Sequence, residues 1–123
     1  MLSLLIKEEI KNHFPEMVKL RRYMHMNPEV SFHEKNTAKF IENYLRELGI
    51  KDVKTNIGLN GVVARIKGKD SSKTLAFRAD FDALPINDEK DVDYKSKIQN
   101  TMHACGHDGH TVSLLATCKV LME

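Results

Sequence analysis

Hydrophobic residues recur at three- and four-residue steps over residues 4–26, which predicts a helix. Pro15 interrupts this pattern, and because proline fits the first turn of a helix but not its interior, we expect a short helix followed by a longer one. The longer helix should end before Pro28, since the residue preceding a proline avoids helical backbone angles. Arg21 and His25 lie four residues apart on one face of it. Taken alone, they favour a surface pair, or a histidine anchored beside the following turn.

A second helical pattern covers residues 33–48, and its polar and apolar positions separate into two faces. Ser31 and Glu34 have the spacing of a capping box, so we expect them to form the start of this helix. Gly49 stands in the usual position just after the last turn. The apolar face is expected to pack against the core and not against a cofactor; it consists of Thr37, Ala38, Ile41, Tyr44, Leu45 and Leu48.

The pattern then changes to that of strands, which are predicted at residues 52–55, 61–67 and 74–79. The polar, turn-prone connection over residues 68–73 favours an antiparallel hairpin between the last two strands. Residues 87–100 are polar and predict an irregular surface loop. A buried helix is predicted from residue 110 onward, and Cys118 on it is expected to be a small core residue.

The composition is that of an ordinary soluble domain, with 41% hydrophobic and 29% charged residues among 123. The formal net charge of +2 comes from 19 basic and 17 acidic residues that are interspersed, so no electrostatic footprint for nucleic acid is present. No apolar run has membrane-spanning length, and no basic leader precedes the first apolar residues. Two cysteines do not make a disulfide framework, so we expect a cytoplasmic protein without a membrane or nucleic-acid partner.

The most informative stretch is residues 102–111, which read Met-His-Ala-Cys-Gly-His-Asp-Gly-His-Thr. Thiolate and imidazole suit zinc and similar divalent metals. Gly106 and Gly109 let the backbone turn neighbouring side chains towards one point. A solvated histidine-rich turn is the alternative. The candidate side chains are His103, Cys105, His107, Asp108 and His110.

Two further carboxylates, Asp80 and Asp82, follow the strand predicted at residues 74–79. Side chains alternate along a strand, so both should point the same way. Two carboxylates leaving a buried strand together repel each other unless a cation or hydrogen-bond donors offset the repulsion. The alternative is that they cap backbone amides of the following turn.

Taken together, three patches resemble the metal-dependent amidohydrolase and aminoacylase family of metallopeptidases. They are residues 21–29 with Glu34 and Thr37, residues 78–86, and residues 102–111. This family includes hippurate hydrolase, auxin-conjugate hydrolases and N-acyl-amino-acid deacetylases, and more distantly zinc carboxypeptidases and aminopeptidases. The resemblance implies an α/β fold, with helices on a mixed β-sheet in the zinc-exopeptidase style. It also implies that residues 1–123 form the N-terminal part of one catalytic domain.

The resemblance also implies roles for individual residues. Cys105 and His107 would ligate a pair of divalent metal ions, namely zinc, manganese or cobalt. Asp82 would be the catalytic acid that orients the active centre. Asp80 stands where more distant relatives carry a metal-binding histidine, which leaves its role open. The residues expected to surround the ligands, orienting them or capping the next helix, are His103, Asp108 and His110.

By this resemblance the parent enzyme, which can be a homodimer, hydrolyses the amide bond of an N-acyl amino acid or a small peptide. Two metal ions would activate water and polarise the scissile carbonyl. In the family, the general-base glutamate and the remaining ligands come from later segments, so we expect residues 1–123 alone to be inactive and poorly folded. Two alternatives are an inactive remnant that binds a partner and a small metal-binding module without hydrolase ancestry.

Overall fold

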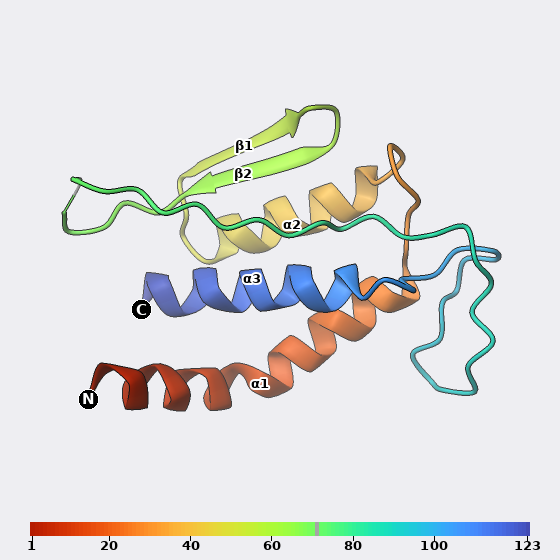
Figure 1. The fold of residues 1–123 in the computed structure, drawn as a ribbon, viewed down its shortest axis with the longest axis horizontal. Coiled ribbons are helices and arrows are strands. Elements are labelled where there is room, and N and C mark those ends of the chain that lie inside the picture. The colour runs from red at the N-terminus through yellow and green to blue at the C-terminus, as the bar shows by residue number, and fades with distance from the viewer. Residues whose placement is uncertain (71) are drawn as a thin grey trace.

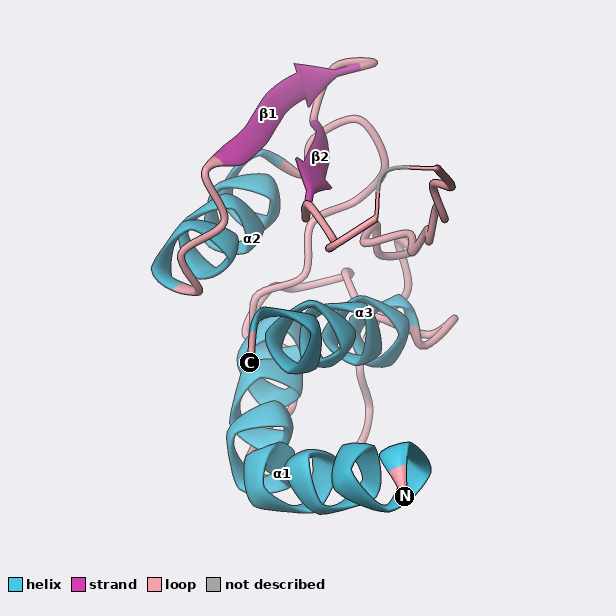
Figure 2. Ribbon diagram, turned by 90° about the vertical axis from the view of Figure 1, so that its left-hand side faces the viewer, coloured by secondary structure: helices cyan, strands magenta, loops and turns pink. Residues whose placement is uncertain are grey.

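The computed structural model describes residues 1–70 and 72–123, and these form three helices and a small antiparallel sheet (Figure 1). The elements in chain order are α1 Leu2–Met26, α2 Lys35–Glu47, β1 Asp52–Ile57, β2 Gly61–Arg65 and α3 His107–Met122. The hairpin packs on α2 and α3 packs on α1, as Figure 2 shows from the side. None of the described helices is long and apolar enough to cross a membrane.

One hydrophobic core joins these two pairs of elements. Its buried side chains come from all three helices, from β1 and from the connection between α2 and β1: Met17, Met24, Ile41, Tyr44, Leu45, Ile50, Val53, Val112 and Leu115. Glu16 on α1 adds a polar link, because its carboxylate accepts a hydrogen bond from Tyr44 Oη on α2 at 3.0 Å and pairs with Lys119 on α3. Cys118 lies half-buried against this core, as the sequence predicted.

The first helix is continuous, so the predicted division at Pro15 is wrong. Proline removes one backbone hydrogen bond and its ring clashes with the preceding turn, which kinks a helix when the flanking turns still form. The axis of α1 bends part-way along its length in Figures 1 and 2. The turns after the proline bury Met17, Met24 and His25. The bend therefore directs the second part of α1 against the core.

The predicted end of α2 is confirmed, whereas its predicted start is wrong. Gly49 has a φ of +87°, and Ile50 N–H donates to Leu45 O at 3.2 Å, which closes the last turn in the expected way. At the other end, the Ser31 hydroxyl donates to Asp82 instead of capping the helix. Glu34 occupies the N-cap position, but within the described residues its side chain makes no hydrogen bond to the first turn of α2.

Glu29 takes over the capping of α2. Its carboxylate accepts the backbone N–H of Thr37 at 2.6 Å and that of Asn36 at 3.2 Å. It also accepts hydrogen bonds from both of these side chains. An acid beside the positive end of the helix dipole is stabilising, and here it satisfies two otherwise unpaired amides.

The hairpin is formed by the first two predicted strands, so the predicted pairing of residues 61–67 with residues 74–79 is wrong. β1 and β2 are antiparallel, with Val53 opposite Ala64. Gly61 is required at the turn, because a Cβ there would lie 2.3 Å from Ile57 O. Residue 71, within the connection predicted at residues 68–73, lies outside the described residues.

Residues 74–79 are extended without forming a strand, so Asp80 and Asp82 do not follow a strand end. A strand is stabilised by a paired neighbour, and nothing in the described part of the chain pairs with this segment. Pairing resumes as isolated bridges, one parallel between Val30 and Ala83 and one antiparallel between Leu84 and Met102. These bridges hold residues 82–84 between the loop after α1 and the loop before α3.

We predict that Glu29→Gln lowers the free energy of unfolding by about 1 kcal/mol, because α2 loses its charged cap. Chemical denaturation measures the loss, and hydrogen exchange of the Asn36 and Thr37 amides locates it. Ser31→Ala serves as the control, since Ser31 does not cap α2. If hydrogen exchange of the Asn36 and Thr37 amides became faster by the same factor in Glu29→Gln and in Ser31→Ala, the assignment of Glu29 as the cap would be contradicted.

Candidate metal centre

His107 lies in the first turn of α3, which begins three residues before the predicted start at residue 110. Its Nδ1 donates to Asp82 Oδ1 at 2.8 Å, and the Asp82 backbone oxygen is 3.0 Å away. Ser31 Oγ donates to the other carboxylate oxygen at 2.5 Å. The Ser31 hydroxyl holds the pKa of Asp82 below its ordinary value, with help from His107 and against the effect of burial.

The paired imidazole has the arrangement of a metal ligand. With Nδ1 donating to a carboxylate, Nε2 of His107 carries the free lone pair, and the carboxylate fixes the ring orientation. Asp82 therefore lies where an orienting acid must lie. Its catalytic role stays a prediction.

Cys105 and His110 lie on either side of His107, and both are exposed. The Cys105 thiol is free, and Gly106 after it has a φ of +75°, a conformation that favours glycine. The His110 ring centroid is 5.9 Å from that of His107. Residues 105–110 thus place an exposed thiol and an exposed imidazole on either side of the partly buried His107 in the sequence.

These donors fit zinc by their chemistry, but they form only part of a site. A thiolate and an imidazole are common zinc ligands, and a closed structural site needs four. Among the described residues, no three of the predicted candidates bring their ligand atoms within 4.8 Å of one another. Cys105 and His107 would therefore supply only some of the ligands that a metal ion needs.

Asp80 has different partners from Asp82. Its carboxylate pairs with Arg78, and its backbone oxygen accepts a hydrogen bond from Thr111 Oγ1 at 2.9 Å. Both carboxylates nevertheless line one open groove of about 330 Å³ between the turn of the hairpin and residues 78–82. The groove places Asp80 beside the candidate centre.

The other two candidates, His103 and Asp108, are buried. Burial lowers the pKa of His103, whose ring nitrogens have no hydrogen-bond partner in the described part of the chain. Asp108 is 0% exposed; its Oδ2 accepts a hydrogen bond from His25 Nδ1 at 2.7 Å and forms an ion pair with Arg21 Nε at 3.0 Å. His25 is itself 2% exposed, so the surface pair favoured by the sequence is wrong for this residue.

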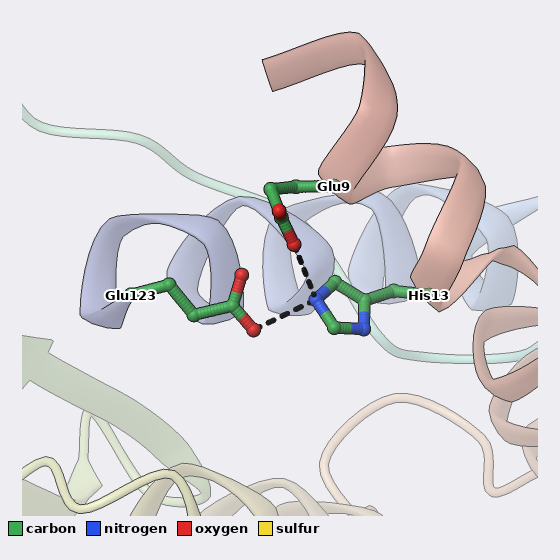
Figure 3. A group of neighbouring side chains, drawn as sticks. All are labelled: Glu9, His13 and Glu123. Atoms are coloured by element: carbon green, nitrogen blue, oxygen red, sulfur yellow. Dashed lines mark ion pairs between the residues drawn. The ribbon is translucent and has the colours of Figure 1, made fainter. Parts of the chain in front are cut away.

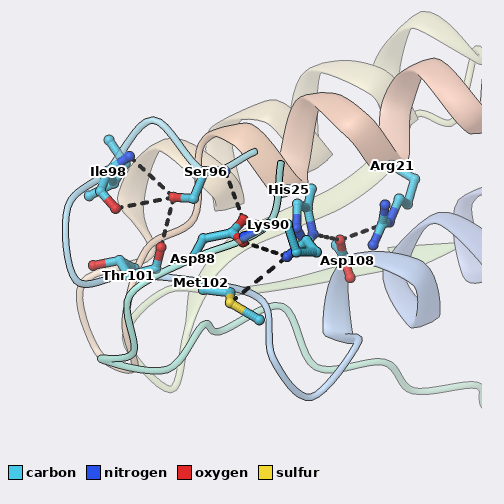
Figure 4. Close-up of polar contacts among 9 residues, drawn as sticks. All are labelled: Arg21, His25, Asp88, Lys90, Ser96, Ile98, Thr101, Met102 and Asp108. Atoms are coloured by element: carbon cyan, nitrogen blue, oxygen red, sulfur yellow. Dashed lines mark hydrogen bonds and ion pairs between the residues drawn. The ribbon is translucent and has the colours of Figure 1, made fainter. Parts of the chain in front are cut away.

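Asp88 was missed, because the loop over residues 87–100 was predicted to be on the surface. Its carboxylate is buried, 3.4 Å from His25 Nε2, and accepts hydrogen bonds from Lys90 Nζ at 2.6 Å and Ser96 N at 2.9 Å (Figure 4). Burial raises the pKa of Asp88, but the Lys90 and Ser96 hydrogen bonds outweigh it and keep the pKa well below the ordinary value. Nothing in the local pattern distinguishes Asp88 from the other acids of this loop.

A second cluster that the sequence did not reveal joins the two ends of the chain. His13 Nε2 lies 2.8 Å from Glu123 Oε1 and 3.5 Å from Glu9 Oε2 (Figure 3). These three side chains bring their ligand atoms within 4.8 Å of one another. They bring α1 next to Glu123, the residue that follows α3, and they would compete for metal in any titration.

Comparisons with known proteins identify relatives of this chain. The sequence model of Peptidase family M20/M25/M40 matches residues 76–123, which include Asp82, Cys105 and His107. YhaA of Bacillus subtilis (strain 168), named provisionally as an amidohydrolase, is 55% identical over 118 residues, covering 96% of this chain and 30% of YhaA. The hippurate hydrolase of Campylobacter jejuni is 48% identical over 106 residues, covering 86% of this chain and 27% of that enzyme.

A solved structure gives the same result. The Bacillus subtilis YxeP protein, described as a dinuclear metal-binding peptidase of the M20 family, superimposes with a TM-score of 0.85. It is 41% identical, with 91% of this chain and 31% of YxeP covered. The chain is related to the M20 metallopeptidases and amidohydrolases. The predicted resemblance to this family and the predicted α/β fold class are thus confirmed. The chain spans about 30% of the length of the curated relatives it matches.

We predict that the chain binds zinc more weakly than a closed structural site, whose binding free energy is roughly 10–16 kcal/mol, because Cys105 and His107 supply only two ligands. Isothermal titration measures the affinity. Cys105→Ser should remove this binding, whereas Cys118→Ser, which changes the half-buried thiol, should not. His13→Gln identifies any ion held by the Glu9 and Glu123 cluster. Tight, stoichiometric binding that survives Cys105→Ser would disprove the ligand assignment.

Proposed function

We propose that this chain supplies part of the active centre of a metal-dependent amidohydrolase that cleaves an N-acyl amino acid or a small peptide. The observation that carries the proposal is the Asp82–His107 pair, 2.8 Å long, beside the exposed Cys105 thiol. The relatives that share this segment are named as an amidohydrolase, a hippurate hydrolase and a dinuclear metal-binding peptidase. A carboxylate-held imidazole next to a free thiol is suited to metal binding.

Cys105 and His107 would hold the metal, and Asp82 would keep the His107 ring in one orientation and one tautomer. Two divalent ions, of zinc, manganese or cobalt, supply such a reaction with an activated water and a polarised carbonyl. Asp82 carries its charge at neutral pH, because its pKa lies below the ordinary value. It can therefore accept the hydrogen bond from His107 Nδ1 at neutral pH.

The groove beside Asp82 is where the chain itself would meet the substrate. Its lining joins apolar residues such as Phe32 and Phe81 to the Arg78 guanidinium. An acyl group suits the apolar side chains, and a substrate carboxylate suits arginine. We propose a cytoplasmic parent enzyme, on the ground of its low cysteine content, and a homodimeric one, as the resemblance implies.

The proposal predicts activity in a chimera in which residues 1–123 replace the matching segment of YhaA, with hydrolysis of hippurate and N-acetyl amino acids assayed by amine release. We expect metal-dependent turnover that Cys105→Ser lowers by at least about tenfold, as loss of a metal-site residue typically does. Cys118→Ser is the matched control and should retain activity. A folded chimera that shows no turnover with zinc, manganese or cobalt would refute the proposed function.

In the same chimera, Asp82→Asn should reduce kcat far more than Asp80→Asn. Asparagine has no charged oxygen to accept the hydrogen bond from His107 Nδ1. Replacing the hydrogen-bond partner of a metal-ligating histidine typically lowers metal affinity or activity roughly 10- to 100-fold. Asp80 pairs with Arg78 instead of a candidate ligand. Steady-state rates with one N-acetyl amino acid decide between them. Equal losses, or a larger loss at Asp80, would mean that the two roles are reversed.

A further inference from the structure

The buried Asp108 carboxylate connects α1 to the start of α3. Oδ2 accepts a hydrogen bond from His25 Nδ1 at 2.7 Å and forms an ion pair with Arg21 Nε at 3.0 Å (Figure 4). Oδ1 accepts the Gly109 backbone N–H at 2.9 Å. Both α1 residues lie in the part of the helix that packs on α3. A fully buried carboxylate is costly unless it is paired, so these donors fix its position.

The fixed residue adjoins the candidate ligand His107. The cap position of α3 is Gly106, which has no side chain with which to hold the first turn. The backbone of residues 107–109 is therefore held through Asp108, while the His107 ring is held separately by Asp82. Loss of the Asp108 contacts would move the His107 backbone, and with it the attachment point of the imidazole, even if Asp82 stayed in place.

His25 is itself held on its other side. Its Nε2 lies 3.4 Å from Asp88 Oδ2, and Asp88 is held in turn by Lys90 and Ser96. The guanidinium of Arg21 lies 5.5 Å from the centroid of the Tyr94 ring, in the same loop. A buried polar network of this kind favours one arrangement, because any other leaves charges unpaired.

We propose that His25 and Arg21 are positioning residues for the metal centre: through Asp108 they set the first turn of α3 and so the place of His107 relative to Asp82 and Cys105. This inference rests on the proposed function, since it takes His107 as a metal ligand. It assigns a function to a pair on α1 that touches none of the candidate ligands directly.

Two readouts on the 123-residue chain test the inference. The first is the thiolate-to-cobalt absorption band, recorded at the cobalt concentration that half-saturates the unmodified chain. The second needs no metal: long-range proton–nitrogen NMR detects the His107 Nδ1 proton that is held by Asp82. Because the second readout is independent of metal binding, the inference remains testable even if the chain shows no cobalt band and the proposed function fails.

In His25→Phe we expect the band to fall from half-saturation to about a tenth or less, the result of a roughly tenfold or larger loss of affinity. The His107 Nδ1 proton signal should disappear. His25→Asn, which restores a donor near Nδ1, should recover both signals. The matched control is His33→Phe, the same change at an exposed histidine, and it should alter neither.

The inference is overturned if folded His25→Phe retains the His107 signal, or if His25→Asn loses as much as His25→Phe. If His25→Phe does not fold, Arg21→Met decides, because the Arg21 side chain is 36% exposed and its loss is better tolerated. A weakened His107 signal in Arg21→Met that Arg21→Lys restores supports the inference, and an unchanged signal contradicts it.

Discussion

The burial of one carboxylate, that of Asp108, governs how α1 and α3 meet beside the candidate centre. A charge removed from water must be paired, and apart from the Gly109 N–H the partners of Asp108 are His25 and Arg21 on α1, more than eighty residues earlier in the chain. Meeting this demand brings the second part of α1 against the start of α3. The hydrophobic core then closes around Met24 and Leu115, so charge pairing and apolar packing favour the same helix arrangement.

The loop between α1 and α2 has a second structural role, because it serves the helix and the centre at once. Glu29 caps α2, while Ser31 two residues later donates to Asp82. The bridge from Val30 to Ala83 lies between these contacts. Displacement of this loop would therefore disturb the start of α2 and the orientation of His107 together.

Strand prediction failed where an extended segment had no neighbour. Residues 74–79 have a strand-like pattern, but the described residues provide no partner strand, and Leu75 is 82% exposed. The hairpin formed instead between segments joined by a tight turn, since short loops cost little entropy to close. The cap of α2 differs from the prediction for a similar reason. Ser31 donates its hydrogen bond to Asp82, and Glu29 accepts the hydrogen bonds of the helix amides.

The sequence by itself determined most of the helical segments, the resemblance to the M20 relatives and the donor types at the candidate centre, because periodicity and the clustering of Cys105 with His107 are local properties. It also predicted that Asp82 orients the centre, and the structure pairs Asp82 with His107. Only the tertiary structure decided that His25 and Asp88 are buried around Asp108. Their pattern resembles that of surface residues, and burial of a charge depends on donors that the fold brings from distant segments.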